Sequence, residues 1–342
     1  MRRKHYSNFA AGQIAALFDD FSRTGAPGVS VLVIRNGRVL FAKGYGLANL
    51  EEQLPCGLNT NFRLASVTKQ FTAMAVMILT KLKKLSLDEP LAEFFPGFPE
   101  YGRQITVRHL LSHNSGLLDY EDLIPKATMI PVLDRDVLRL LLEQDRTYFP
   151  PGSKFRYSNS GYAVLAQIVE VISANTFAHF LKKSIFEPLQ MNHTLAYEQG
   201  LSVIPNRAYG YSSDGARFKR ADQSLTSSVL GDGGIYSSVA DLYRWDQALY
   251  STTLISRKML DLAFCPATGT DHPGTGYGFG WYIGSYRGLK ETWHSGNTIG
   301  FTTHLTRFPE KKLTVIILSN RSEAKIVELV RILADSFLSD CR

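Results

Sequence analysis

Ser66 and Lys69 stand one helical turn apart in the stretch RLASVTKQFTAM, which otherwise has the composition of a buried helix. The neighbours of Lys69 on such a helix are small or apolar, so we expect its amine to contact protein rather than water. Burial lowers the pKa of a lysine, because the charged form loses its hydration. A neutral amine beside a serine hydroxyl can take its proton, and this spacing is typical of lysine-activated serine nucleophiles.

The same spacing has a plain structural interpretation, and it occurs twice. Ser66 could be the N-cap of the helix that follows, with Lys69 on the surface. Ser322 and Lys325 repeat the pattern at the start of a helix with a charged outer face, where we expect Lys325 to be solvated. The pair at 66 and 69 therefore needs support from elsewhere in the chain.

Two further patterns supply that support. Tyr157 and Asn159 stand in FRYSNSGY just before a predicted helix, and His294 and Gly296 stand in TWHSGN within a predicted strand. Their order along the chain places them on a loop of the helical region and at a sheet edge.

Each of these patterns also has a second copy in an unsuitable place. Tyr6 and Asn8 lie in the N-terminal tail, and His272 and Gly274 lie in a predicted turn. The proline at 273 would disrupt a central strand. Only the first set fits one site.

With these three motifs in this order, the chain resembles the serine β-lactamase and penicillin-binding protein superfamily. Within it, the chain is similar to class C β-lactamases, D-alanyl-D-alanine carboxypeptidases, D-aminopeptidases and related esterases. The matching stretches span about residues 27 to 320: VSVLVIRNGRVLFAKGYGLAN, ITVRHLLSHNSGL, YFPPGSKFRYSNSGY, FEPLQMNHT and GDGGIYSSVADL.

The resemblance implies a role for each motif residue. Ser66 would be the nucleophile and form an acyl-enzyme, and Lys69 and Tyr157 would move its proton and supply one to the leaving group. Asn159 would orient Lys69 and the substrate. The backbone N–H groups of Ser66 and Asn297 would form the oxyanion hole.

The resemblance also implies substrate contacts by His294, Ser295 and Gly296, the glycine by allowing close approach. Tyr120, which follows the HNSGL loop, is either a further cleft residue or ordinary loop packing. His294 stands where many β-lactamases have lysine, which favours a peptidase or esterase without excluding a β-lactamase or D-alanyl-D-alanine carboxypeptidase.

The predicted activity is thus that of a cofactor-free serine hydrolase acting on esters or amides of small molecules or peptides. Whether the substrate is an ester, a D-amino-acid peptide or a β-lactam is not encoded in these motifs. The alternative from another class is a catalytically inactive relative that binds or scaffolds. The intact set of four polar side chains at 66, 69, 157 and 159 argues against it.

The elements that must position these residues follow from the apolar pattern. Strand-like runs occupy both ends of the chain, including a hairpin signal at Asn36–Gly37. Helical patterns dominate from 66 to about 260, and further helices are predicted at 8–23 and 321–338. We therefore predict an α+β, β-lactamase/transpeptidase-like fold with one antiparallel sheet built from both chain ends and flanked by the terminal helices. Residues 1–64 and 265–342 would form this sheet subdomain and residues 65–264 a mostly helical one, with the active site between them.

Other functional classes find little support. The net charge of +7 is dispersed, so no nucleic-acid surface is predicted, and the three cysteines are too far apart for a zinc or disulfide framework. His109 and His113 have helical metal-ligand spacing, but core or loop packing is favoured and no metal is expected. GDGGIYS is interpreted as a turn lining the cleft rather than a phosphate loop. No apolar run is long enough for a signal peptide or membrane span, so we expect a cytoplasmic protein, or an exported one whose signal is missing. Oligomeric state is not encoded.

Overall fold

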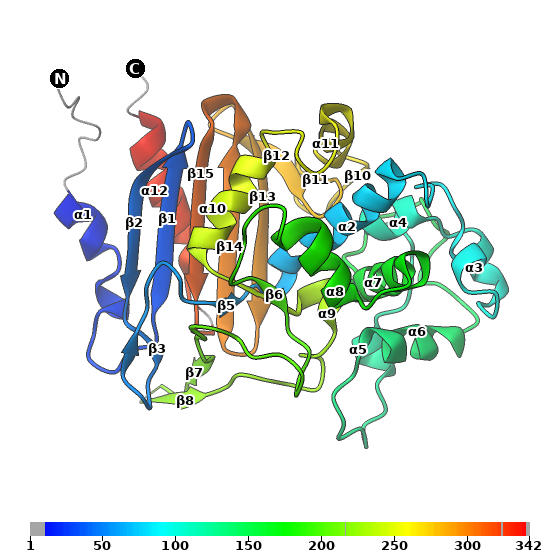
Figure 1. Cartoon of the computed structure of the whole chain (residues 1–342), viewed down its shortest axis with the longest axis horizontal. Helices are drawn as coiled ribbons and strands as arrows, with labels where there is room; N and C mark the ends of the chain where they lie inside the picture. Colours follow the sequence, from blue (N-terminus) through cyan, green and yellow to red (C-terminus); the bar gives the residue numbers. More distant parts are fainter. Residues whose placement is uncertain (1–10, 216, 323, 340–342) are drawn as a thin grey trace.

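The two ends of the chain meet in one antiparallel sheet, as the sequence predicts. The computed structural model describes residues 11–215, 217–322 and 324–339. Within them the sheet has the order β10-β11-β12-β13-β14-β15-β1-β2 (Figure 1). The strands are β1 (Val29–Arg35), β2 (Arg38–Tyr45), β10 (Thr268–Gly269), β11 (Gly276–Tyr277), β12 (Tyr282–Tyr286), β13 (Leu289–Thr298), β14 (Phe301–Phe308) and β15 (Leu313–Ser319). The N-terminal hairpin joins the C-terminal strands where β1 pairs with β15.

The predicted hairpin at Asn36–Gly37 is confirmed. Asn36 and Gly37 connect β1 to β2 with φ angles of 49° and 71°, and a two-residue turn with two positive φ angles matches the twist of the flanking strands. The β14–β15 connection is a short 3-10 turn, Pro309–Lys311. These local signals therefore set the strand pairing at both ends of the chain.

Terminal helices cover one face of the sheet, as predicted. α1 (Ala11–Ala16) is followed by a 3-10 turn (Asp19–Phe21), and α12 (Ile326–Ser339) closes the described chain. Their apolar side chains share a core with alternate residues of β1 and β15, because side chains two apart on a strand face the same side. The first part of the predicted 8–23 helix, residues 8–10, lies outside the described residues.

The middle of the chain is mostly helical. Most of it lies to one side of the sheet, at the right in Figure 1, while the helix Val239–Ala248 crosses in front of the strands. Its helices are α2 (Lys69–Lys81), α3 (Leu91–Phe94), α4 (Val107–Leu111), α5 (Tyr120–Leu123), α6 (Asp134–Leu142), α7 (Asn159–Ser173), α8 (Phe177–Leu181), α9 (Leu230–Gly233), α10 (Val239–Ala248) and α11 (Arg257–Ala263). Short strands lie among or before them: β3 (Leu47–Asn49), β4 (Leu54–Pro55), β5 (Phe62–Arg63), β6 (Leu195–Ala196), β7 (Tyr211–Ser213), β8 (Phe218–Arg220) and β9 (Ile235–Ser237). A continuous apolar core joins this region to the sheet.

The length and composition of each helix show whether it could span a membrane. Among the described residues no single helix is long and apolar enough to cross a membrane, although α7 and the segment 177–186 pass the length and composition test together as a pair bent by 77°.

Candidate active site

Ser66 and Lys69 lie where a 3-10 turn, η2 (Ala65–Thr68), runs into α2. Side chains three residues apart eclipse one another in 3-10 geometry, and the Nζ of Lys69 lies 3.1 Å from the Oγ of Ser66. Neither η2 nor α2 has a side-chain cap at its start. The capping interpretation of Ser66 is therefore wrong, and its hydroxyl faces the lysine instead.

The other contacts of Lys69 decide where its lone pair can point. Its Nζ lies 2.8 Å from the Oδ1 of Asn159 and 2.9 Å from the backbone oxygen of Asp232. Neither oxygen carries a proton, so each accepts one N–H of the amine. A neutral amine has only two N–H bonds, and its lone pair is then left facing the Ser66 hydroxyl. The Asn159 amide is held in this orientation because its Nδ2 donates to the Oε1 of Glu121, at 3.3 Å.

Burial of Lys69 favours that neutral form. The side chain is fully shielded from solvent, and burial lowers its pKa to about 8, while the charges of Asp232, Glu121 and Asp119 act to raise it. Burial also raises the pKa of the neighbouring Asp232 to about 6. The neutral amine is therefore far more accessible near neutral pH than it is for a solvated lysine.

Tyr157 and Asn159 reach Lys69 together because the residue between them caps a helix. Ser158 is extended, with φ −137° and ψ 111°, and its Oγ accepts the N–H of Gly161 in α7. Side chains alternate along an extended backbone, so those at 157 and 159 project to one side while Ser158 turns back to the helix. The Nζ of Lys69 lies 4.9 Å from the centre of the Tyr157 ring.

The phenol of Tyr157 is kept in its protonated form. Burial raises its pKa above the usual range, and proximity to Ser66 offsets part of the rise. That proximity is not a regular hydrogen bond, since the buried Tyr157 hydroxyl has no hydrogen-bond partner among the described residues. A buried unpaired hydroxyl costs free energy. A polar group of a bound substrate would supply the hydrogen-bond partner that the Tyr157 hydroxyl lacks.

The strand β13 closes the other side of Ser66 because position 296 is glycine. A Cβ there would lie 2.5 Å from the Oγ1 of Thr303 and 3.0 Å from the Cβ of Ala65. Thr303 on β14 in turn donates to the backbone oxygen of Leu64, at 2.7 Å. The backbone of β13 therefore packs directly against the segment that carries Ser66, and Asn297, the next residue, lines the same pocket as Ser66.

Of the predicted substrate-binding residues, Tyr120 lines the pocket beside Ser66, and the segment from His294 to Gly296 does not. The Tyr120 hydroxyl donates to the Oδ2 of Asp232, at 3.1 Å. His294 is buried and does not line the pocket, and its Nε2 shares a hydrogen bond with the Tyr277 hydroxyl, at 2.9 Å. Ser295 faces the opposite side of β13, because neighbouring side chains alternate. Substrate contact by the segment from His294 to Gly296 stays a prediction.

The pocket beside Ser66 is small and polar, and it includes residues that sequence reasoning did not select. These are Arg63, Glu121, Thr226, Asp232 and Gly233. Two of them, Asp232 and Gly233, belong to the stretch GDGGIYS, which the sequence predicted as a turn lining the cleft without selecting either residue for the site. Glu121 and Thr226 carry no comparable signal, because nothing in the spacing of residues shows which loops meet.

The alternative copies of the motifs lie elsewhere. Lys325 and His272 are exposed, and Tyr6 and Asn8 lie outside the described residues. His109 and His113 have separate partners: their Nδ1 atoms accept the N–H groups of Thr106 and Ser158. Among the described residues no group of three or more His, Cys, Asp or Glu side chains could hold a metal ion.

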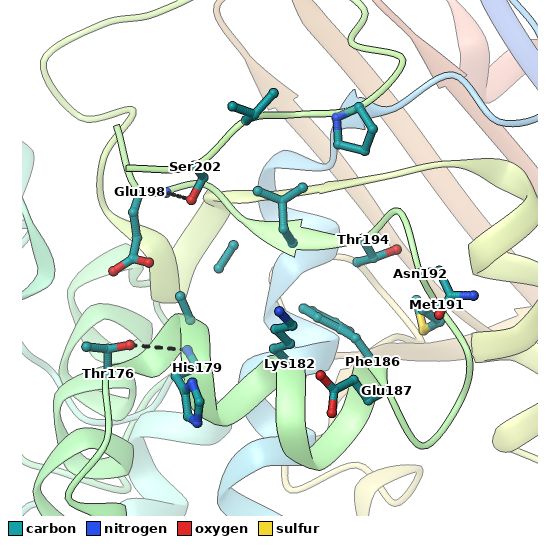
Figure 2. Close-up of a pocket in the computed structure, with 15 residues that line it drawn as sticks. Thr176, His179, Lys182, Phe186, Glu187, Met191, Asn192, Thr194, Glu198 and Ser202 are labelled. Atoms are coloured by element: carbon teal, nitrogen blue, oxygen red, sulfur yellow. Dashed lines mark hydrogen bonds between the residues drawn. The ribbon is translucent and has the colours of Figure 1, made fainter. Parts of the chain in front are cut away.

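A much larger groove, of about 640 Å³, lies between α8 and the segment 191–205 (Figure 2). Its lining includes Lys182, Phe186 and Glu198, and none of the candidate catalytic residues. The groove therefore exceeds the pocket beside Ser66 in size, but it lacks the buried amine beside a hydroxyl.

Comparison with known proteins finds a family match over most of the chain. The Beta-lactamase family model matches residues 14–335. The chain is 33% identical to Penicillin-binding protein 4* of Bacillus subtilis over 94% of its own length and 72% of that protein. It is 27% identical to a D-aminopeptidase of Gluconobacter oxydans, over 96% of the chain and 62% of that protein.

Solved structures share the fold. An octameric penicillin-binding protein homologue from Pyrococcus abyssi superposes with a TM-score of 0.85 at 28% identity, covering 95% of this chain and 77% of that one. A penicillin-binding protein from Bacillus halodurans superposes with a TM-score of 0.82 at 26% identity, covering 94% and 98%.

Proposed function

Because the chain belongs to the Beta-lactamase family, we propose that it is a serine hydrolase that forms an acyl-enzyme on Ser66 and hydrolyses esters or amides of small molecules or peptides. The observation that carries the proposal is the buried amine of Lys69, which lies 3.1 Å from the Ser66 hydroxyl while its two other contacts are to oxygens that can only accept. Homologues named as penicillin-binding proteins and a D-aminopeptidase support the hydrolase class.

The geometry supports a proton path from Ser66 through Lys69 and Tyr157 to the leaving group. As the Oγ of Ser66 bonds to the substrate carbonyl carbon, Lys69 takes its proton. The oxyanion accepts hydrogen bonds from the backbone N–H groups of Ser66 and Asn297. Tyr157 gives its proton to the leaving group and regains one from Lys69, and the same pair then activates the water that releases the acyl group.

The alternative of an inactive binding protein is less economical. A buried lysine costs free energy, and a binding surface has no need to keep one beside a partly exposed serine. An unpaired Tyr157 hydroxyl adds a second cost of the same kind. Both costs are expected where a protein is organised for catalysis.

The deciding experiment is intact-protein mass spectrometry after incubation, separately, with a p-nitrophenyl ester, a D-alanyl peptide and a penicillin. We expect a covalent adduct or turnover with wild type and neither with Ser66→Ala. Ser322→Ala, in the second copy of the motif, is the matched control and should behave as wild type. An adduct that persists in Ser66→Ala would contradict the proposal, and the ranking of the three compounds would select among esterase, D-peptidase and β-lactamase.

A further inference from the structure

The phenol of Tyr157 is not held in place by its own hydroxyl, which has no hydrogen-bond partner among the described residues. Its position must therefore come from its backbone and from the packing of its ring. Both are contacted by a single residue, His113, in the loop that follows α4.

His113 contacts the backbone on either side of Tyr157. Its carbonyl oxygen accepts the N–H of Arg156, at 2.9 Å, and its Nδ1 accepts the N–H of Ser158, at 3.0 Å. Its ring also packs on the ring of Tyr157, with centroids 4.3 Å apart. Three contacts from one residue thus hold the N–H groups of the residues before and after Tyr157 and one face of its ring.

These contacts define the state of the imidazole. A backbone N–H can only donate, so the Nδ1 of His113 carries no proton and the neutral ring has its proton on Nε2. That Nε2 is buried without a hydrogen-bond partner among the described residues. The centroid of the His113 ring lies 5.0 Å from that of Tyr162 and 4.4 Å from that of Tyr277. Aromatic faces can accept such an N–H weakly. Burial lowers the pKa of His113 well below its usual value, which keeps the ring neutral.

The backbone of His113 is unusual as well. Its φ is +57°, a left-handed conformation in which histidine, asparagine and aspartate are the most frequent side chains after glycine. Asparagine therefore offers a conservative replacement, because it tolerates this conformation and can place an acceptor near the position of Nδ1.

We propose that His113 is the positioning residue for the proton donor Tyr157: it clamps the peptide groups of residues 156 and 158 and packs against the phenol, without touching substrate. The inference rests on the proposed function, since it concerns the proton that Tyr157 delivers to the leaving group. It assigns the HNSGL loop a role in catalysis through Tyr157.

The kinetic test compares two esters with the same acyl group, one with a p-nitrophenolate leaving group and one with an alkoxide. Protonation matters more for the poorer leaving group. His113→Leu should therefore lower kcat/KM for the alkyl ester at least about tenfold more than for the p-nitrophenyl ester, as Tyr157→Phe should. His113→Asn should recover most of that difference. His109→Asn, in the preceding helix α4, is the control and should keep the wild-type ratio of the two rates.

A folded His113→Leu variant with the wild-type ratio would overturn the proposal. If that variant does not fold, His113→Asn and His113→Gln decide, because the longer glutamine cannot place its acceptor at the position of Nδ1. A ratio near wild type in the first and a raised one in the second supports the clamp, and equal ratios overturn it.

A second measurement does not depend on turnover. Nitrogen-15 NMR of wild type labelled at its histidines should show His113 as the neutral tautomer protonated on Nε2 between about pH 5 and 8. The His113 signals are identified as those missing from the spectrum of His113→Asn. A proton on Nδ1, or a charged ring in that range, would overturn the inference. An enzyme that is inactive on all substrates but shows this tautomer would count against the proposed function alone.

Discussion

At the scale of single residues, the proton affinity of Lys69 is the property on which the proposed chemistry depends. Two opposing effects set it: burial lowers the pKa, and nearby carboxylates raise it, Asp232 first among them. The sequence indicates the first effect, through the small apolar neighbours of Lys69. It does not indicate the second, because Asp232 is 163 residues away and meets Lys69 only in the folded chain.

This balance predicts the pH dependence of acylation. The base must be neutral, so kcat/KM should rise with pH through about 8, the pKa of Lys69. Asp232→Asn removes a negative charge but keeps an acceptor for Tyr120, so the pKa of Lys69 should fall and the rising limb should move to lower pH. Stopped-flow acylation across pH measures this. The control is Glu310→Asn, which removes an acidic side chain from the β14–β15 turn. A rising limb that stays in place or moves to higher pH in Asp232→Asn would be inconsistent with a lysine base.

At the scale of elements, the close contact between β13 and η2 depends on Gly296. Gly296→Ala would place a Cβ against the Leu64 carbonyl and the Thr303 side chain, so β13 must move away from Ser66. Because this displaces the proposed oxyanion donor, we expect a loss of about 10²-fold or more in kcat/KM, with a folded protein. Gly269→Ala, where a Cβ would meet nothing within 4 Å, is the matched control. Similar activities for the two variants would contradict the assigned role of β13.

The same sheet carries a buried histidine that the sequence did not single out. His304 on β14 is almost fully buried, and neither ring nitrogen has a hydrogen-bond partner among the described residues. Burial lowers its pKa to about 3, and the charge of Arg331 adds to the effect. Because the unfolded chain takes up this proton below about pH 6.5, His304 should cost stability progressively as the pH falls towards its folded pKa.

His304→Leu should therefore stabilise the protein, by about 1 kcal/mol near neutral pH, since it removes unpaired polar atoms from the core. The gain in the free energy of unfolding should grow between about pH 6.5 and 4, because in this range the wild-type histidine takes up a proton on unfolding and the leucine of the variant does not. Urea denaturation at several pH values measures both. His272→Leu, at an exposed turn, should leave the acid sensitivity unchanged. A gain that shrinks at low pH would rule out the neutral buried histidine.

At the scale of the whole molecule, a buried ion pair connects α10, in the middle of the chain, to β14 of the sheet. The Nε of Arg307 on β14 lies 2.8 Å from the Oδ1 of Asp246 on α10, and both side chains are at most 2% exposed. Thr314 on β15 donates to the same oxygen, at 2.8 Å. This contact links residues that the sequence analysis assigned to different subdomains, and the predicted boundary at 264/265 stays a prediction.

Asp246→Asn should lower the free energy of unfolding by about 3–5 kcal/mol, because it leaves the Arg307 charge buried without a counter-charge. Thermal and urea denaturation would measure the loss. The matched control is Asp261→Asn, which removes an exposed pair with Arg257 and should have little effect, since exposed pairs contribute little. Equal effects of the two changes would show that burial does not govern this pair.

The sequence alone determined the local features of this protein. The hairpin at Asn36–Gly37, the C-terminal strands, the long helices and the one-turn spacing of Ser66 and Lys69 all depend on residues close together in the chain, where backbone geometry and apolar periodicity act directly. Family resemblance extended this to Tyr157, Asn159 and the β13 motif. Only the tertiary structure decided that Ser66 is not a helix cap, that Asp232 and Glu121 flank the amine, and that His113 holds Tyr157. The contacts of Asp232 and Glu121 with the amine and its neighbours, and of His113 with Tyr157, join segments far apart in the sequence. They are set by how the loops pack, and packing leaves no periodic signal in the chain that could be read in advance.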